Sequence, residues 1–132
     1  LPKAADLFLE DGEEVTAGTV TLRAISTPGH TPGSTCLVVG RHLFTGDTLF
    51  PGGPGKTGSP ENLKQIIKSI TGKLFKLDDD LTVYPGHGED GDLKTSKEEY
   101  KVFSFVDHRD DLCGDVHWLK DQWGRDWESE KR

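Results

Sequence analysis

Alternation of apolar and polar side chains divides the first half of the chain into short strands separated by glycine turns. Residues 15–26 are predicted to form a β-hairpin, because Ala17-Gly18 is a turn and apolar residues alternate with polar ones after it. Residues 34–39 and 42–45 are predicted to form two further strands, joined by a tight turn at Gly40-Arg41. The first half of the chain therefore reads as a set of paired strands.

A helical pattern follows in residues 59–77. Ser59 is a suitable N-cap, and Pro60 suits the first helical position. Apolar residues recur along one helical face, at Leu63, Ile66, Ile67, Ile70 and Leu74. A strand is predicted over residues 81–85 and a second helix over residues 96–105. The order strand, helix, strand is typical of a layered α/β domain, in which the apolar face of the helix packs on the sheet.

Three side chains of the metal-ligand type lie in glycine-flanked turns, each directly after a predicted strand. His30 is central in T-P-G-H-T-P-G-S, Asp47 lies in F-T-G-D-T-L, and His87 lies in V-Y-P-G-H-G-E. Proline fixes φ and glycine permits a positive φ, so these segments are rigid turns. Imidazole nitrogen and carboxylate oxygen are usual ligands of zinc and non-haem iron. Each residue alone is a common turn or surface residue, but together they predict a metal site.

These three motifs, in this order, resemble the second half of a metallo-β-lactamase-fold hydrolase of the glyoxalase II-like group. The resemblance implies the α/β (α+β) fold class, as one half of a four-layer αβ/βα sandwich that has a mixed sheet with helices on one face. It also implies a dinuclear metal site, usually zinc. By motif, His30 resembles the histidine that completes the first metal site, Asp47 the carboxylate that bridges both metals, and His87 the histidine of the second.

One motif of that family has no counterpart in this sequence. The remaining ligands of the family come from an H-x-H-x-D-H segment, and this chain has no H-x-H. Asp107-His108 follows the other motifs and does not replace it. With a bridging Asp47, each metal has one histidine and this carboxylate, whereas catalytic zinc usually takes three protein ligands. We expect either a piece of a longer polypeptide or a reduced relative, with weak metal binding and little hydrolysis in the isolated chain.

The function implied is hydrolysis of a small-molecule thioester or ester by a metal-bound hydroxide, with Asp47 holding both ions and orienting the nucleophile. Lys56 either binds a substrate carboxylate or is a solvated lysine in the glycine-rich loop 50–58. This loop is no Walker phosphate loop, because Phe50 stands where that pattern requires glycine. Two alternatives stay open. One is a mononuclear iron enzyme resembling the persulfide dioxygenases, and the other is a non-catalytic module for binding or assembly.

Composition and net charge limit the classes of binding partner that the chain can have. The length of 132 residues accommodates one domain at most, and we divide the chain into a partial domain over residues 1–119 and a charged tail over residues 120–132. A net charge of −7 argues against nucleic acid. No apolar run is long enough to span a bilayer, so no membrane partner is predicted. Cys36 in an apolar run and Cys113 in a polar segment favour a reduced, cytoplasmic protein.

The remaining histidines, Tyr84 and the tryptophans are assigned to roles outside the metal site. Tyr84 is predicted to pack in the core. His42 is interpreted as a structural or surface residue because it has no glycine-flanked setting like those of the three ligand candidates. His108 and His117 are placed outside the metal site because neither has a paired ligand at metal spacing. A homo-oligomer is an open alternative, formed through an exposed sheet edge. The tryptophans of the C-terminal region are assigned to packing or oligomer contacts; they are Trp118, Trp123 and Trp127.

Overall fold

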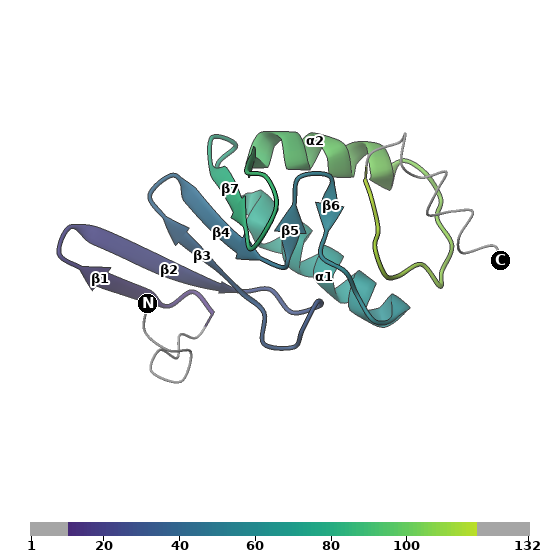
Figure 1. The fold of residues 1–132 in the computed structure, drawn as a ribbon, viewed down its shortest axis with the longest axis horizontal. Coiled ribbons are helices and arrows are strands. Elements are labelled where there is room, and N and C mark those ends of the chain that lie inside the picture. Colours follow the sequence, from purple (N-terminus) through teal and green to yellow (C-terminus); the bar gives the residue numbers. More distant parts are fainter. Residues whose placement is uncertain (1–10, 119–132) are drawn as a thin grey trace.

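The computed structural model describes residues 11–118 and consists of a mixed six-stranded sheet, a small two-stranded sheet and two helices (Figure 1). The order in the large sheet is β1-β2-β3-β4-β7-β8. Its strands are β1 (Glu14–Ala17), β2 (Val20–Ser26), β3 (Thr35–Val39), β4 (His42–Gly46), β7 (Thr82–Pro85) and β8 (Gly91–Asp92). The small sheet pairs β5 (Leu49–Phe50) with β6 (Gly53–Pro54). The short helix end expected near residues 4–9 and the tail over residues 120–132 lie outside the described residues.

The predicted strands are confirmed, and their observed ends differ from the predicted ends by no more than one residue. β1 and β2 form the expected hairpin, in which Ala17 pairs with Val20 across a turn where Gly18 has φ +64°. The next three strand contacts are β2 with β3 and β3 with β4, both antiparallel, and β4 with β7, which is parallel. The parallel pair requires a crossover, and α1 (Pro60–Gly72) supplies it.

Helix α1 begins as its sequence predicts but ends earlier. The hydroxyl of Ser59 accepts a hydrogen bond from the backbone N–H of Asn62 and caps the first turn. The helix stops at Gly72, and Leu74–Lys76 form a separate 3-10 turn, η2, so the prediction of one helix over residues 59–77 was too long. Glycine weakens a helix because it loses more backbone freedom than other residues do, and the break falls directly after it.

The core lies between one face of the sheet and the two helices α1 and α2 (Leu93–Ser104), as the fold class predicted. Cys36, Leu43 and Val83 are fully buried on the same face of β3, β4 and β7. The cluster that covers this face includes Ile66, Ile70, Leu93, Phe103 and Trp118. The structure buries Trp118 completely, against Tyr100 and Phe75, which confirms its packing role. Trp123 and Trp127 lie outside the described residues.

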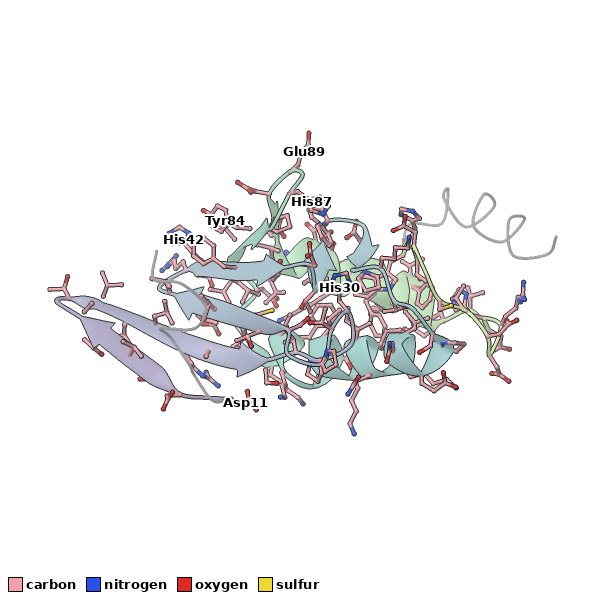
Figure 2. The ribbon with its side chains drawn as sticks, turned by 60° about the horizontal axis from the view of Figure 1, so that its bottom comes forward. Asp11, His30, His42, Tyr84, His87 and Glu89 are labelled. Atoms are coloured by element: carbon pink, nitrogen blue, oxygen red, sulfur yellow. The ribbon has the colours of Figure 1, made fainter. Side chains whose placement is uncertain are left out.

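The opposite face of the same strands is apolar and partly exposed. Phe44 is 43% exposed, and its ring stacks on Tyr84 at a centroid distance of 5.2 Å. Tyr84 also contacts the ring of His42, and Figure 2 shows these two side chains together. The prediction that Tyr84 packs in the core was therefore wrong. Successive side chains of a strand point to opposite faces of the sheet, so Tyr84 lies on the outer face because Val83 is buried on the inner one.

Candidate metal centre at the strand ends

The topology brings the three predicted ligand turns to one edge of the sheet. β2 and β4 are each antiparallel to β3, so both run in the same direction, and β7 is parallel to β4. The three strands consequently end at the same edge. His30 follows β2, Asp47 follows β4 and His87 follows β7. Residues up to 57 positions apart in sequence thus meet because of strand order, not local sequence.

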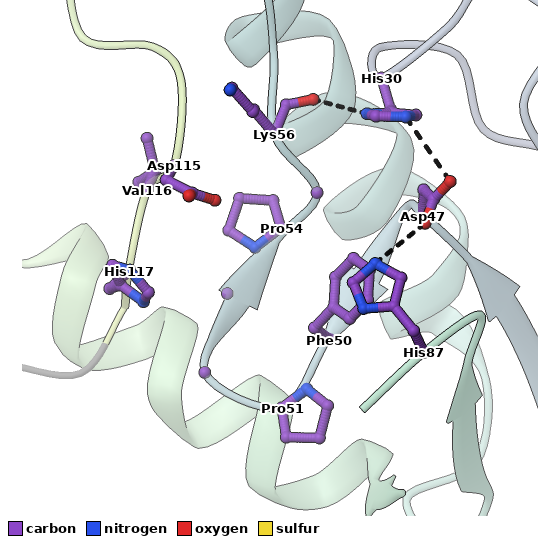
Figure 3. Close-up of a pocket in the computed structure, with 13 residues that line it drawn as sticks. His30, Asp47, Phe50, Pro51, Pro54, Lys56, His87, Asp115, Val116 and His117 are labelled. Atoms are coloured by element: carbon purple, nitrogen blue, oxygen red, sulfur yellow. Dashed lines mark hydrogen bonds and ion pairs between the residues drawn. The ribbon is translucent and has the colours of Figure 1, made fainter. Parts of the chain in front are cut away.

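Asp47 lies between the two histidines (Figure 3). Its Oδ2 atom is 3.6 Å from Nε2 of His30, and its Oδ1 atom is 3.5 Å from Nε2 of His87. Each carboxylate oxygen therefore faces a different imidazole. The side chains are 32% exposed for His30, 51% for Asp47 and 78% for His87, so the group opens to solvent on the His87 side.

The His30 turn is anchored from two sides. At its base, the backbone N–H of Thr27 donates to the carbonyl of Ser34 at 2.8 Å. Helix α1 anchors the same turn, because the hydroxyl of Ser69 donates to the carbonyl of Pro28 at 2.9 Å. Gly29 has φ +149° and lies so close to α1 that a Cβ atom there would be 2.3 Å from Cβ of Ile66. Glycine is thus required both by conformation and by close approach.

The glycine-rich loop orients His30 through its backbone. Nδ1 of His30 lies 2.6 Å from the carbonyl oxygen of Lys56. A carbonyl only accepts, so Nδ1 is the donor in this contact, and Nε2, which faces Asp47, is the nitrogen left to bind a metal ion. A histidine that binds metal through Nε2 usually donates its other N–H to such an acceptor. The side chain of Lys56 is exposed and lines the pocket, which leaves both of its predicted roles open.

The turns that carry Asp47 and His87 are joined by main-chain hydrogen bonds. The N–H of Thr48 donates to the carbonyl of Thr45 at 2.8 Å and closes the Asp47 turn. The N–H of Gly86 donates to the carbonyl of Gly46 at 2.8 Å, and this hydrogen bond connects the turn that carries His87 to the turn that carries Asp47. The ring of Phe50 lies beside the ring of His87, at a centroid distance of 4.9 Å.

These residues form one end of an open pocket of about 430 Å³. The other wall is the segment after α2, where Asp115, Val116 and His117 face the β5–β6 hairpin (Figure 3). His117, which is predicted to lie outside the metal site, lines the same pocket but lies away from Asp47 (Figure 3). Phe50, Asp115 and His117 were missed as pocket residues. Phe50 begins the glycine-rich loop 50–58, and its closeness in sequence to Asp47 was the signal for it. For Asp115 and His117, the only signal was the placement of residues 112–118 after the last predicted helix, which names no partner.

His108 is also away from the centre. Its ring stacks on Phe103 at a centroid distance of 3.8 Å, and its Nε2 atom lies 2.9 Å from the carbonyl oxygen of the same residue. His108 therefore packs against α2, and Asp107-His108 does not stand beside Asp47.

The donor set fits a metal centre only in part. Nε2 of each histidine and one oxygen of Asp47 supply an imidazole and a carboxylate to each of two positions. Among residues 11–118, no three or more His, Cys, Asp and Glu side chains form a group that could hold one ion. The carboxylate between two histidines suits two neighbouring ions, and each ion would take its further protein ligand from elsewhere.

Within the part of the chain that the structure describes, no helix has the length and hydrophobicity needed to cross a bilayer.

The fold and the site together define half of a layered α/β domain with a histidine–carboxylate group at one sheet edge. Residues 1–87 match the family model of the metallo-beta-lactamase superfamily. This chain belongs to the metallo-beta-lactamase superfamily, as its motifs predicted. Members of this superfamily bind metal ions.

Curated relatives fall into more than one functional class. The chain is 35% identical to the mitochondrial persulfide dioxygenase ETHE1 of Homo sapiens, over 76% of this chain and 41% of that protein. It is 41% identical to the probable polyketide biosynthesis zinc-dependent hydrolase BaeB of Bacillus velezensis, over 61% of this chain and 36% of that protein. It is 40% identical to a hydroxyacylglutathione hydrolase of Anaeromyxobacter dehalogenans, over 62% of this chain and 32% of that protein. The chain thus spans about a third to two fifths of the length of these relatives.

Solved structures agree with the fold. ETHE1 from Myxococcus xanthus superposes with a TM-score of 0.64 at 33% identity, over 72% of this chain and 44% of that one. The protein TTHA1623, solved in a di-iron-bound form, superposes with a TM-score of 0.57 at 27% identity, over 67% and 44%. The relatives therefore include hydrolases and a dioxygenase, and proteins that bind zinc or iron.

Proposed function

We propose that this chain supplies the second half of the catalytic centre of a metal-dependent hydrolase that cleaves a small-molecule thioester or ester. The observation that supports the proposal is the position of Asp47 between His30 and His87, with one carboxylate oxygen toward each imidazole. A carboxylate so placed suits two cations held side by side. The identity to hydrolases of the superfamily supports the reaction class.

Bound metal would act as a Lewis acid and lower the pKa of water in the site. The residues of this chain then have distinct roles. Asp47 and the two histidines hold the ions, and the hydrogen bond from Nδ1 of His30 to the carbonyl of Lys56 keeps that ring from rotating. The side chain of Lys56 neutralises a carboxylate of the substrate, and the ring of Phe50 supports the ring of His87 inside the pocket.

We propose zinc, with two ions in the complete site, because a relative described as zinc-dependent is 41% identical. The ligand that each ion lacks in residues 11–118 comes from a further segment or a partner chain. The remaining proposals follow the charge and composition: a cytoplasmic protein with a small-molecule substrate, without nucleic acid or membrane as a partner, and with a homo-oligomer as an alternative.

A second candidate is a persulfide dioxygenase with a single iron. Its support is the similarity to ETHE1 of Homo sapiens and to the solved ETHE1 of Myxococcus xanthus. In this case His30 and Asp47 hold the iron, and His87 does not.

A third candidate is a binding or assembly module without catalysis. Its support is that residues 11–118 hold no group of three ligands around one ion. The partly exposed apolar face that carries Phe44 would then be available for association.

Bound metal per chain distinguishes these candidates. Elemental analysis is carried out on protein purified without added metal, for the unmodified chain and for His30→Ala, His87→Ala and His42→Ala. His42 is the matched control, because it lies on the other face of the sheet beside Tyr84 (Figure 2). About two zinc ions per chain, lost with either site histidine but kept in His42→Ala, would mean that residues outside 11–118 complete the site and would support the hydrolase.

About one iron per chain, lost in His30→Ala and kept in His87→Ala, would support the dioxygenase instead. Metal at background in every sample would remove catalysis for this chain and leave the module. A thioester assay completes the test, since Asp47→Asn must abolish any hydrolysis that accompanies bound zinc.

A further inference from the structure

A buried pair of hydroxyl groups connects the turn that carries His30 to the turn that carries Asp47. Oγ1 of Thr27 lies 3.1 Å from Oγ1 of Thr48, and both residues are at most 1% exposed. Thr27 stands three residues before His30, and Thr48 directly follows Asp47. The two threonines are 21 residues apart in sequence, so the contact exists only in the folded chain.

Each threonine is also part of the base of its own turn. The N–H of Thr27 donates to the carbonyl of Ser34 and closes the His30 turn, and the N–H of Thr48 donates to the carbonyl of Thr45 and closes the Asp47 turn. The carbonyl of Thr48 accepts from the N–H of Gly55, which precedes Lys56. A displacement of either side chain would therefore move the turn to which its backbone belongs.

The hydroxyls belong to a small polar network inside the core. Oγ1 of Thr27 also lies 3.3 Å from Sγ of Cys36, and that thiol donates to the carbonyl of Thr45 at 3.8 Å. Burial raises the pKa of the Cys36 thiol, so the sulfur stays protonated and able to donate. The donor and acceptor roles are consistent if the hydroxyl of Thr48 donates to the hydroxyl of Thr27, and the hydroxyl of Thr27 donates to the carbonyl of Ser34, which is 3.4 Å away.

We propose that Thr27 and Thr48 are positioning residues of the metal centre, which act as one hydrogen-bonded unit that fixes His30 relative to Asp47. A hydroxyl inside a dry core is costly to leave without a partner, so the two side chains hold one mutual arrangement. The proposal rests on the proposed function, because it assigns the pair to the metal site of that function. Neither threonine contacts the pocket, and both act through their neighbours.

Substitution by valine tests the pair, because valine keeps the shape of threonine and removes the hydroxyl. The variants are Thr27→Val, Thr48→Val and the double variant, with Thr27→Ser to restore the hydroxyl. Thr57→Val is the matched control. Thr57 is 3% exposed and lies beside Lys56, but its hydroxyl has no hydrogen-bond partner within the described structure.

The first measurement is the dissociation constant for Zn²⁺ alone, obtained by competition with a chelating dye. Each single valine variant is expected to weaken zinc binding about 10- to 100-fold, the usual effect of losing a group that orients a ligand. The double variant should be no weaker than the singles, because the pair acts as one unit. Thr27→Ser and Thr57→Val should stay within about twofold of the unmodified chain.

The proposal would be overturned if the loss of zinc affinity in the double variant equalled the product of the losses in the two single variants. It would also be overturned if the single valine variants bound zinc as tightly as the unmodified chain.

A second measurement, amide hydrogen exchange without metal, separates failure of this proposal from failure of the proposed function. Thr27→Val is expected to raise exchange in both turns, residues 28–33 and residues 46–48. Increased exchange in residues 28–33 alone overturns the positioning role, whether or not zinc binds. If the unmodified chain binds no zinc, the proposed function fails, and increased exchange in both turns still supports the coupling of the two turns.

Discussion

Nδ1 of His30 lies 2.6 Å from the carbonyl oxygen of Lys56, so the glycine-rich loop acts on the site through its backbone. We therefore expect Lys56→Ala to leave both the bound metal and the stability unchanged, with the free energy of unfolding shifted by no more than about 0.5 kcal/mol. Elemental analysis and urea denaturation measure the two quantities. Loss of metal in this variant would show that the ammonium group itself supports the centre.

Gly55 has no room for a side chain. A Cβ atom there would be 1.6 Å from the carbonyl oxygen of Asp47, and that atom belongs to rigid backbone. Gly55→Ala is expected to lower the free energy of unfolding by about 1–3 kcal/mol, as overpacked sites do, and to displace Asp47. Gly58→Ala is the control, since nothing lies within 4 Å of its Cβ position. Equal urea midpoints for the two variants would contradict the close approach.

Neighbouring residues of β4 should respond differently to truncation. Leu43 is fully buried, whereas Phe44 is 43% exposed on the other face. Leu43→Ala is expected to cost about 2–5 kcal/mol of unfolding free energy because it leaves a cavity. Phe44→Ala loses mainly its contact with Tyr84 and is expected to cost about 1 kcal/mol. Guanidinium denaturation orders the two variants, and the opposite order would show that the exposed face is the stabilising one.

Glu99 on α2 makes stability depend on pH. Burial raises the pKa of Glu99 above its ordinary value of 4.5, although its carboxylate accepts a hydrogen bond from the N–H of Gly52. A raised pKa in the folded protein means that folding favours the protonated acid. The contribution of Glu99 to stability is thus fully present below about pH 4.5 and is lost as the pH rises through the folded pKa.

Glu99→Gln should remove this dependence, because glutamine can still accept from Gly52 but does not titrate. The variant is expected to be at least as stable as the unmodified chain at neutral pH, with the difference shrinking toward acid. Urea denaturation between about pH 4 and pH 7 measures this difference. A variant that loses stability most at neutral pH would show that the charged carboxylate is the stabilising form.

Much of the local structure was predictable because its causes are local. The Pro-Gly pairs around His30, the cap at Ser59 and the turn at Gly18 depend on the conformations of a few adjacent residues. Tyr84 was mispredicted because an apolar residue in a strand indicates burial without saying on which face. The face was decided by Val83 and by pairing with Phe44.

The sequence by itself determined strands β1, β2, β3, β4 and β7, the existence of the two helices, and the three turns that carry His30, Asp47 and His87. Only the tertiary structure decided that these turns share one sheet edge, that the loop of Lys56 orients His30, and that Thr27 touches Thr48. Propensities and turn chemistry act over a few residues, whereas these contacts join residues 17 to 40 positions apart. Strand order and helix packing set such distances, and no short stretch of sequence contains them.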